Sequence, residues 1–286
     1  MPPTARIIDG RALAGAVRAE VAARTELLRR GGRRVRLDAV IAGDDGGALL
    51  YAQNQAATCA EVGIEYHLHR LDPEASFEDV AGRVLLLNAS DEVTAIMVHL
   101  PLPAGVDTER VQSLIDPQKD VEGVNPANIG NVVYGRRSLV PCTALAVMEM
   151  IESTGISLPG RRCVVVGAGN IVGKPIAVLL MRAEATVTST NRHTVDQGEL
   201  TRGADVVVAA AGVPGLIRAE MVRPGAIVVD VGINRVRSAD GRTLTVGDVA
   251  FDEVRAIAGW ISPVPGGVGP MTVAMLLRNT VDAAGR

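Results

Sequence analysis

The sequence has few aromatic residues, no excess of basic charge and no long hydrophobic run. Aromatic side chains make up 2% of its 286 residues and the formal net charge is −3. The chain therefore lacks the stacking platforms and the basic surface that nucleic-acid binding requires. No apolar run reaches the roughly 20 residues of a transmembrane helix, and residues 1–10 lack the pattern of a signal peptide. We therefore expect no nucleic-acid or membrane partner and a cytoplasmic location.

Cysteine is also scarce, and its three positions are scattered: Cys59, Cys142 and Cys163. An odd, dispersed set predicts small buried residues rather than disulfide partners or metal ligands. His67 and His69 alternate along the predicted strand 65–71 with no Cys or carboxylate at ligand spacing. We interpret them as surface histidines, and we predict no metal site.

Apolar periodicity divides the chain into alternating strands and helices. In the first half, helices are predicted at 11–30, 48–62, 76–88 and 108–115, and strands at 35–42, 65–71 and 93–100. Residues 119–138 are predicted to be irregular, typical of a functional loop or a domain connection. After a helix that begins at 145–151, strands are predicted at 163–166, 185–190, 206–210, 227–231 and 259–262, and helices at 248–257 and 271–284. This alternation predicts an α/β fold with mostly parallel sheets.

Residues 161–175 form the most informative stretch. Cys163 to Val166 is a short apolar run suited to a buried strand, and Gly167 and Gly169 follow at once. Helical periodicity then begins, with Gly173 early in the predicted helix, where a missing side chain allows close packing. A strand, a glycine turn and a helix N-terminus together can hold a pyrophosphate with backbone N–H groups. The third glycine comes one position later than in G-x-G-x-x-G.

The end of the following strand indicates which nucleotide is bound. An NAD site usually has an acidic residue there for the ribose 2′-hydroxyl. This chain has Asn191, Arg192 and His193 instead. The planar guanidinium of Arg192 is suited to a 2′-phosphate, whereas an ordinary loop charge is the alternative interpretation. We predict NADP as the cofactor.

Two further segments have unusual composition. Tyr51 precedes Gln55 by four residues, which places both on one face of the predicted helix. Residues 263–270 contain three glycines and three prolines, which are costly in any regular element. Their simplest role is a tight turn, but a rigid backbone wall against a flat ligand is compatible with it and is the interpretation we favour.

These motifs resemble, over nearly the whole length, those of the bifunctional methylenetetrahydrofolate dehydrogenase/methenyltetrahydrofolate cyclohydrolase family. The matching segments are Tyr51 in its helix and residues 98–103, 119–123, 141–143, 170–175, 229–234, 247–249 and 265–272. The resemblance implies two α/β domains with a cleft between them, the second a Rossmann-type domain. It assigns residues 1–140 plus 268–286 to a folate-binding catalytic domain and 141–267 to the NADP-binding domain. It also implies a homodimer.

The resemblance further implies three sets of site residues. The positions that match catalytic residues of the family are Tyr51, Gln55, His99 and Glu122. The positions that match its cofactor-binding residues are Thr143, Gly167, Ala168, Gly169, Ile171, Val172, Arg192, His193 and Ile233. The folate substrate is expected on Tyr51, Gln55, Val98, His99, Leu100, Glu122, Pro265, Gly266, Gly267, Val268, Gly269 and Pro270.

Several of these positions depart from the family's pattern. Gln55 stands where the family has its acid/base lysine, His99 where it has glutamine, and Glu122 where it has aspartate. Hydride transfer needs alignment but no proton transfer, so glutamine is compatible with it. Hydrolysis of the methenyl cation needs a group that titrates. The sequence therefore predicts a dehydrogenase with a weak or lost cyclohydrolase. A paralogue with a rewired hydrolysis or an altered substrate, and a non-catalytic folate- or nucleotide-binding protein, are the alternatives.

Overall fold

A computed structural model describes residues 4–43, 46–237 and 241–285. The chain forms two compact units, one of Met1–Ala14 and Thr143–Thr272 and the other of Gly15–Cys142 and Val273–Arg286. The main difference from the predicted division concerns residues 1–14, which were expected in the first domain. They lie in the unit of residues 143–272 because β1 (Arg6–Ile7) pairs with β11 (Trp260–Ile261) as a parallel edge strand.

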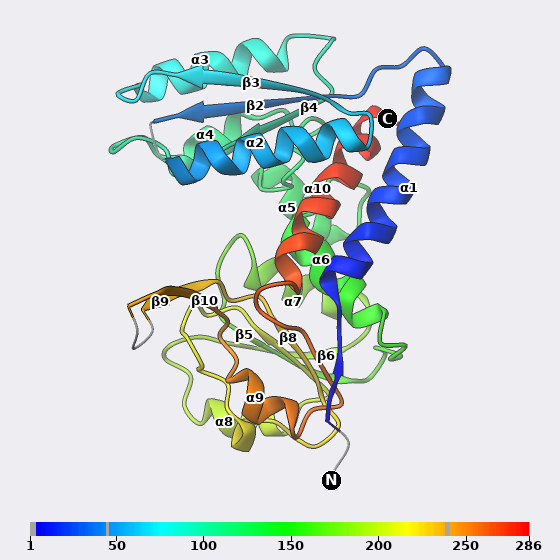
Figure 1. Cartoon of the computed structure of the whole chain (residues 1–286), viewed down its shortest axis with the longest axis vertical. Helices are drawn as coiled ribbons and strands as arrows, with labels where there is room; N and C mark the ends of the chain where they lie inside the picture. Colours follow the sequence, from blue (N-terminus) through cyan, green and yellow to red (C-terminus); the bar gives the residue numbers. More distant parts are fainter. Residues whose placement is uncertain (1–3, 44–45, 238–240, 286) are drawn as a thin grey trace. The chain divides into compact units, whose positions relative to one another are not determined.

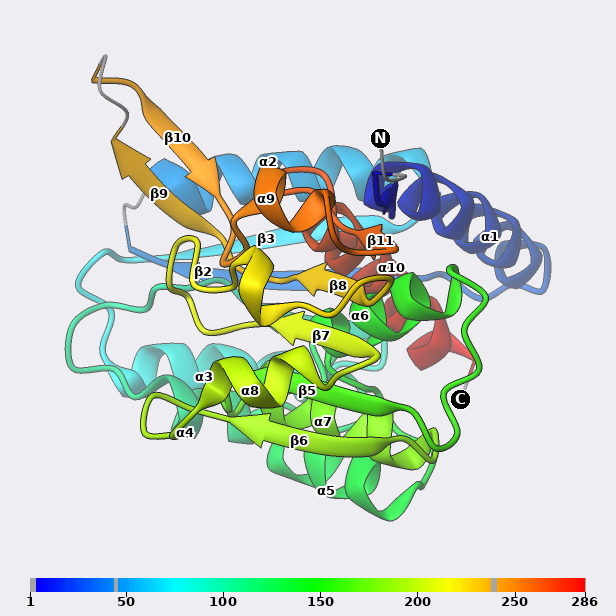
Figure 2. The same cartoon turned by 90° about the horizontal axis from the view of Figure 1, so that it is seen from below.

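The unit of residues 143–272, hereafter the nucleotide unit, contains a six-stranded parallel sheet in the order β1-β11-β8-β7-β5-β6. Figure 2 shows the strands from β11 to β6 side by side. Five of its strands were predicted from the sequence: β11, β5 (Arg162–Val166), β6 (Thr186–Thr190), β7 (Val206–Ala209) and β8 (Ile227–Asp230). Valine, isoleucine and alanine dominate β7 and β8, which are buried along their whole length, as expected of strands covered on both faces.

The helices of this unit begin with α6 (Cys142–Glu152) and α7 (Gly173–Arg182). The others are α8 (Gln197–Arg202), η1 (Ala219–Met221) and α9 (Phe251–Arg255). The sequence analysis missed β1, η1 and the antiparallel pair β9 (Asn234–Arg237) and β10 (Thr243–Val246). It also predicted too long a helix at 248–257, since α9 is only five residues long.

The other unit, hereafter the folate unit, contains a three-stranded parallel sheet in the order β3-β2-β4. Its strands are β2 (Arg36–Ala42), β3 (Glu65–Leu71) and β4 (Ala95–Val98). The sheet lies between α2 (Gly46–Glu61) on one face and α3 (Phe77–Asn88) on the other, as Figures 1 and 2 show. The helix α4 (Thr108–Leu114) packs with α3 through a shared apolar core that includes Val84 and Val111.

The structure corrects two predictions about Gly- and Pro-rich segments. Residues 119–138 were predicted to be irregular, but they contain α5 (Pro126–Tyr134), which Asn125 caps and Pro126 begins. Residues 263–270 were predicted as one turn, but α10 (Val268–Ala284) begins inside them. In both segments the residues that looked like helix breakers occupy positions where a helix N-terminus tolerates them.

The first helix, α1 (Gly10–Arg30), follows the predicted range closely. None of the helices in the described ranges combines the length and apolar character that crossing a bilayer requires.

Candidate functional site

The glycine turn after β5 is built from close backbone approaches that side chains would prevent. Gly167 has φ +108°, and a Cβ there would stand 2.1 Å from the carbonyl oxygen of Ala210. A Cβ on Gly173 would stand 1.8 Å from the carbonyl oxygen of Gly167. The structure thus confirms that Gly173 permits close packing, although its neighbour is the turn itself and not the strand. Strand, turn and helix together have the close backbone packing that a phosphate-binding motif requires.

A cavity of about 790 Å³ lies on this turn, at the carboxyl ends of β5, β6 and β7. This volume lies within the usual range for small-molecule sites. The cavity is lined by Gly167, Ala168, Gly169, Asn191, Arg192, His193, Thr194, Gln197, Ala210, Ala211, Val213 and Leu216. It brings together five of the nine predicted cofactor residues. Thr143, Ile171, Val172 and Ile233 do not line it.

Arg192 and His193 supply the polar groups at the outer end of this cavity. The Nε of Arg192 donates to Nε2 of His193 at 3.1 Å, and the backbone N–H of His193 donates to Oδ1 of Asn191 at 2.9 Å. No acidic side chain lines the cavity among the described residues. The site therefore fits an anionic group beyond the glycine turn.

Two buried carboxylates hold the loop after β7, which the sequence analysis did not assign to the site. Oδ2 of Asp248 accepts from the backbone N–H groups of Ala211 and Gly212 at 2.7 and 2.8 Å. Asp230 in turn accepts from the backbone N–H of Asp248 at 2.9 Å. Desolvation raises the pKa of Asp230 to about 6, although its backbone donors oppose the shift. A signal was present in the sequence, because residues 210–212 directly follow a strand predicted to end at the same sheet edge as Gly167.

A second, smaller cavity of about 160 Å³ lies in the nucleotide unit. It is lined by Arg11, Asp230, Val231, Gly232, Ile233, Thr245, and residues 263–270. Residues 263–270, predicted as a backbone wall against a ligand, line this cavity, and Ile233 lines it rather than the larger one. Close contacts fix the wall, since a Cβ on Gly10 would stand 1.8 Å from the carbonyl oxygen of Gly267.

In the folate unit, α2 carries Tyr51 and Gln55. Gln55 is 3% exposed, and neither its Oε1 nor its Nε2 has a hydrogen-bond partner among the residues that the structure describes. Leaving a buried polar group unpaired costs about 1–3 kcal/mol, so such groups require an explanation. An amide that is buried and unpaired is ready to bind a ligand that presents both a donor and an acceptor.

His99 follows β4 and lies beside Tyr51. The two rings meet edge to face, with centroids 5.9 Å apart and an interplanar angle of 79°. The backbone N–H of His99 donates to the carbonyl of Val40 at 2.8 Å, and its Nε2 lies 3.1 Å from the hydroxyl of Tyr66. Desolvation lowers the pKa of His99 to about 4, so the ring is neutral at pH 7. Tyr66, on β3, was missed, although its place on a predicted strand was correct.

Glu122 joins this group through its electrostatics. Desolvation and then the charge of Asp120 raise the pKa of Glu122 to about 7, while a hydrogen bond from the backbone N–H of Val98 opposes the rise. Desolvation, Glu122 and the Cys142 thiol raise the pKa of Tyr51 to about 12. Tyr51 is 43% exposed as a residue, so this shift reflects the surroundings of its hydroxyl. The structure therefore brings Tyr51, His99 and Glu122 into one region.

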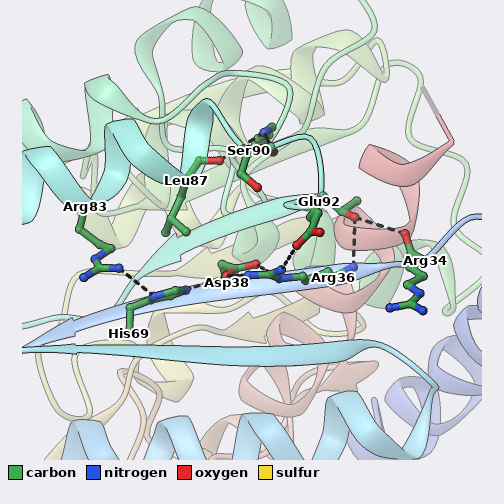
Figure 3. Close-up of polar contacts among 10 residues, drawn as sticks. Arg34, Arg36, Asp38, His69, Arg83, Leu87, Ser90 and Glu92 are labelled. Atoms are coloured by element: carbon green, nitrogen blue, oxygen red, sulfur yellow. Dashed lines mark hydrogen bonds and ion pairs between the residues drawn. The ribbon is translucent and has the colours of Figure 1, made fainter.

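The prediction for His69 was wrong, because this side chain is not an isolated surface group. Its Nε2 contacts Oδ1 of Asp38 at 2.6 Å, and Asp38 is fully buried. Asp38 also accepts two hydrogen bonds from Arg36 at 2.7 and 2.8 Å, and Arg83 lies 3.5 Å from Nδ1 of His69, as Figure 3 shows. The buried carboxylate of Asp38 therefore holds the side chain of His69. Among the described residues, no group of three His, Cys, Asp or Glu side chains is arranged to hold a metal.

The cysteines are as predicted, since all three are free and buried. The Sγ of Cys142 donates to the carbonyl of Val121 at 3.1 Å, and Nδ2 of Asn279 approaches the same sulfur at 3.4 Å. Burial raises the pKa of this thiol well above its usual value, which makes it unreactive.

Comparison with known proteins agrees with both units. The catalytic-domain model of the tetrahydrofolate dehydrogenase/cyclohydrolase family matches residues 8–122, and its NAD(P)-binding-domain model matches residues 141–286. The chain is 48% identical over 280 residues to bifunctional protein FolD 1 of Rubrobacter xylanophilus, covering 98% of this chain and 97% of that protein.

Two solved structures are similar over the whole length. The FolD methylenetetrahydrofolate dehydrogenase/cyclohydrolase of Campylobacter jejuni superposes with a TM-score of 0.93, at 38% identity and 98% coverage of both chains. The Trypanosoma brucei enzyme, solved with NADP and an inhibitor, also gives 0.93, at 40% identity and 99% and 98% coverage. These matches confirm the predicted α/β class and nicotinamide-nucleotide cofactor. The chain belongs to the tetrahydrofolate dehydrogenase/cyclohydrolase family.

Proposed function

We propose that this protein oxidises 5,10-methylenetetrahydrofolate to 5,10-methenyltetrahydrofolate with NADP and has little cyclohydrolase activity. The observation that carries the proposal is Gln55, a buried amide with both polar atoms unpaired. An amide can bind and orient a substrate with a donor and an acceptor, but it does not titrate. The position therefore supports a reaction that needs alignment and does not support one that needs proton transfer.

The glycine turn supports the cofactor assignment. The close approaches at Gly167 and Gly173 leave room for a pyrophosphate, and Arg192 and His193 line the same cavity. When bound there, NADP supplies a hydride acceptor. Arg192 would hold the 2′-phosphate with its free guanidinium donors, and no acidic lining residue in the described chain would compete for the ribose hydroxyls. The FolD of Trypanosoma brucei was solved with NADP, in agreement with this choice.

Hydrolysis of the methenyl product makes a different demand. The attacking water must lose a proton, and a positioned acid/base group typically contributes about 10²–10⁴-fold. Gln55 has no proton to exchange, and the lowered pKa of His99 makes that ring a weak base. We infer that the replacement of a titratable group at position 55 removes most of this step.

Glu122 favours a second candidate, in which hydrolysis is rewired. A carboxyl with a pKa of about 7 is matched to acid/base work near neutral pH. In that case the chain would retain both activities, and Glu122 would transfer the proton that the Gln55 amide cannot. The third possibility, a binding protein without turnover, gains no support from the intact glycine turn.

One assay separates these functions. The absorbance of the methenyl product is followed with 5,10-methylenetetrahydrofolate and NADP, then with NAD. Product that accumulates and decays no faster than in buffer supports the proposal. Accelerated decay that Glu122→Gln abolishes supports the second candidate. Tight binding of either ligand without turnover would contradict both.

Two expectations stay predictions: a homodimer, which the resemblance implies, and a cytoplasmic location, which the composition indicates. Chromatography with light scattering measures the first and fractionation of cells the second.

A further inference from the structure

The hydrogen bond between Tyr66 and His99 links two strands on opposite sides of β2. Tyr66 comes from β3, and His99 comes directly after β4. Nε2 of His99 and the hydroxyl of Tyr66 are 3.1 Å apart, and His99 is 3% exposed. Tyr51 fixes the ring from a third direction by its edge-to-face contact. The imidazole therefore has one defined position and one defined polar neighbour.

The proton inventory of this pair decides what His99 offers to a ligand. A neutral imidazole has one N–H and one lone pair, and a phenol has one O–H. Either tautomer leaves one donor of the pair without a partner in the described part of the chain, but a phenol O–H is a stronger donor than an imidazole N–H, and an imidazole nitrogen is a stronger acceptor than a phenol oxygen. In the described part of the chain, the Tyr66 hydroxyl has no second hydrogen-bond partner. The phenol therefore donates to Nε2, and the imidazole proton lies on Nδ1.

We propose that Tyr66 is a positioning residue that holds His99 as the Nδ1–H tautomer, so that His99 donates a hydrogen bond to the folate substrate and does not act as a base. The inference rests on the proposed function for the identity of the substrate. Nδ1 of His99 has no hydrogen-bond partner among the described residues and is therefore available to an acceptor atom of the pterin. Because the Nε2 lone pair is occupied by Tyr66, a rewired hydrolysis would have to use Glu122.

The surroundings of both rings favour this arrangement. Desolvation, followed by the nearby Cys59 and Tyr51, raises the pKa of Tyr66, so its hydroxyl keeps its proton. Desolvation keeps His99 uncharged at neutral pH. Among the residues that the structure describes, the titratable groups that contact the His99 ring are Tyr66 on β3 and Tyr51 on α2, and neither carries a charge at pH 7.

The tautomer is measurable in the ligand-free protein. Long-range proton–nitrogen NMR distinguishes Nδ1–H from Nε2–H imidazoles, and the chain has only four histidines. The spectrum of His99→Gln identifies the His99 signals. We expect Nδ1–H in the wild-type protein. In Tyr66→Phe, we expect the Nδ1–H share to fall and the midpoint of the His99 titration to rise by about one pH unit, since a net hydrogen bond of about 1 kcal/mol is lost.

Tyr134→Phe is the matched control, because it makes the same chemical change at a residue that is 77% exposed. It should leave the His99 signals unchanged. An Nε2–H tautomer in the wild-type protein overturns the proposal, and so does a tautomer that is insensitive to Tyr66→Phe. The wild-type spectrum decides the first of these even if the variant does not fold.

Ligand binding tests the consequence. Tyr66→Phe should weaken the binding of tetrahydrofolate by about fivefold, as expected for one disordered hydrogen bond, and leave NADP binding unchanged. Equal affinity for tetrahydrofolate in variant and wild type contradicts the donor role. The two proposals fail separately. Absence of turnover with an Nδ1–H tautomer contradicts only the proposed function, whereas turnover with an Nε2–H tautomer contradicts only this inference.

Discussion

Two sets of buried polar groups, one in each unit, differ in their hydrogen bonding. In the nucleotide unit, both oxygens of Asp230 and both oxygens of Asp248 accept hydrogen bonds, chiefly from backbone N–H groups. In the folate unit, Gln55 is equally buried, yet both of its amide atoms are unpaired within the described chain. A completed network makes loops rigid, whereas unpaired atoms are costly until a ligand binds. The first arrangement is typical of a scaffold, and the second is typical of a binding site.

The shifted ionisable groups of the two units, by contrast, share one main cause. Asp230 has a pKa of about 6 despite several hydrogen-bond donors, because burial outweighs them. Glu122 and His99 are shifted in opposite directions, to about 7 and about 4, and in each case burial is the largest cause. Burial thus favours the neutral form of both groups, which suits a site that binds a polar ring without strong charge.

The comparison predicts its largest effect at Asp230. In Asp230→Asn, the new NH₂ group would face backbone donors in place of an oxygen, so we expect a loss of about 2–4 kcal/mol in the free energy of unfolding. Trp260, the only tryptophan, lies in β11 of the same sheet and reports unfolding of this unit by fluorescence in urea. Asp252→Asn, at an exposed position, is the control. A loss below 1 kcal/mol would show that the network is not scaffold.

The second effect concerns Gln55, where the comparison predicts a change in activity. Gln55→Lys introduces a group that titrates, and we expect hydrolysis of the methenyl product to accelerate by about 10²-fold. Decay of methenyl absorbance above the buffer rate measures it. Gln53→Lys makes the same change on an exposed position of α2 and should have no effect. If the decay rate of Gln55→Lys stays at the control value, the site that contains His99 and Glu122 does not let a lysine at position 55 act as an acid or a base.

The third effect concerns the outer end of the nucleotide cavity. Arg192→Ala should weaken NADP binding by about tenfold and NAD binding by less than twofold, because charge-assisted hydrogen bonds to a phosphate contribute about 1.5–3 kcal/mol. Titration of each nucleotide against the ligand-free protein gives both constants. Arg182→Ala, exposed at the end of α7, is the control. Equal losses for the two nucleotides would remove the phosphate role from Arg192.

Local patterns in the sequence predicted much of the fold. The bounds of β3 were predicted correctly, and β5 to β8 were found within one residue at each end. The core of β5 and the strands β7 and β8 are short, mainly apolar runs, which local periodicity identifies. Among the missed elements, β1 depends on a distant partner. The two residues of β1 form a strand only because β11 lies beside them, and no local pattern specifies that pairing.

The candidate site divides along the same line. Gly167 and Gly173 could be predicted because their backbone chemistry is local. The Tyr66–His99 contact joins two strands that are not neighbours in the sheet, so only the sheet order reveals it. The burial of Asp38 beside His69 is likewise a property of the assembled sheet. Contacts between side chains that the assembled sheet brings together could not be predicted from the sequence alone.

The smallest effect is a pH dependence that separates Glu122 from its neighbours. The pKa of Glu122 in the folded protein lies above its ordinary 4.5, so folding takes up a proton, and stability falls as pH rises through about 7. His99 acts in the opposite sense, but its contribution is complete above pH 6.5 because its folded pKa is lowered to about 4. Between pH 6.5 and 8 we therefore expect the folate unit to lose about 1 kcal/mol, after allowance for solvent screening.

Hydrogen exchange of the β2 amides measures this loss, after correction for the intrinsic exchange rate at each pH. Glu122→Gln should abolish the pH dependence in that window, because an amide does not titrate. Glu149→Gln changes a carboxylate in the nucleotide unit and should leave the pH dependence as it is. A slope that survives Glu122→Gln would assign the proton to another group. The two units would then differ only in their hydrogen bonding, and Glu122 would not be a candidate for acid/base catalysis near neutral pH.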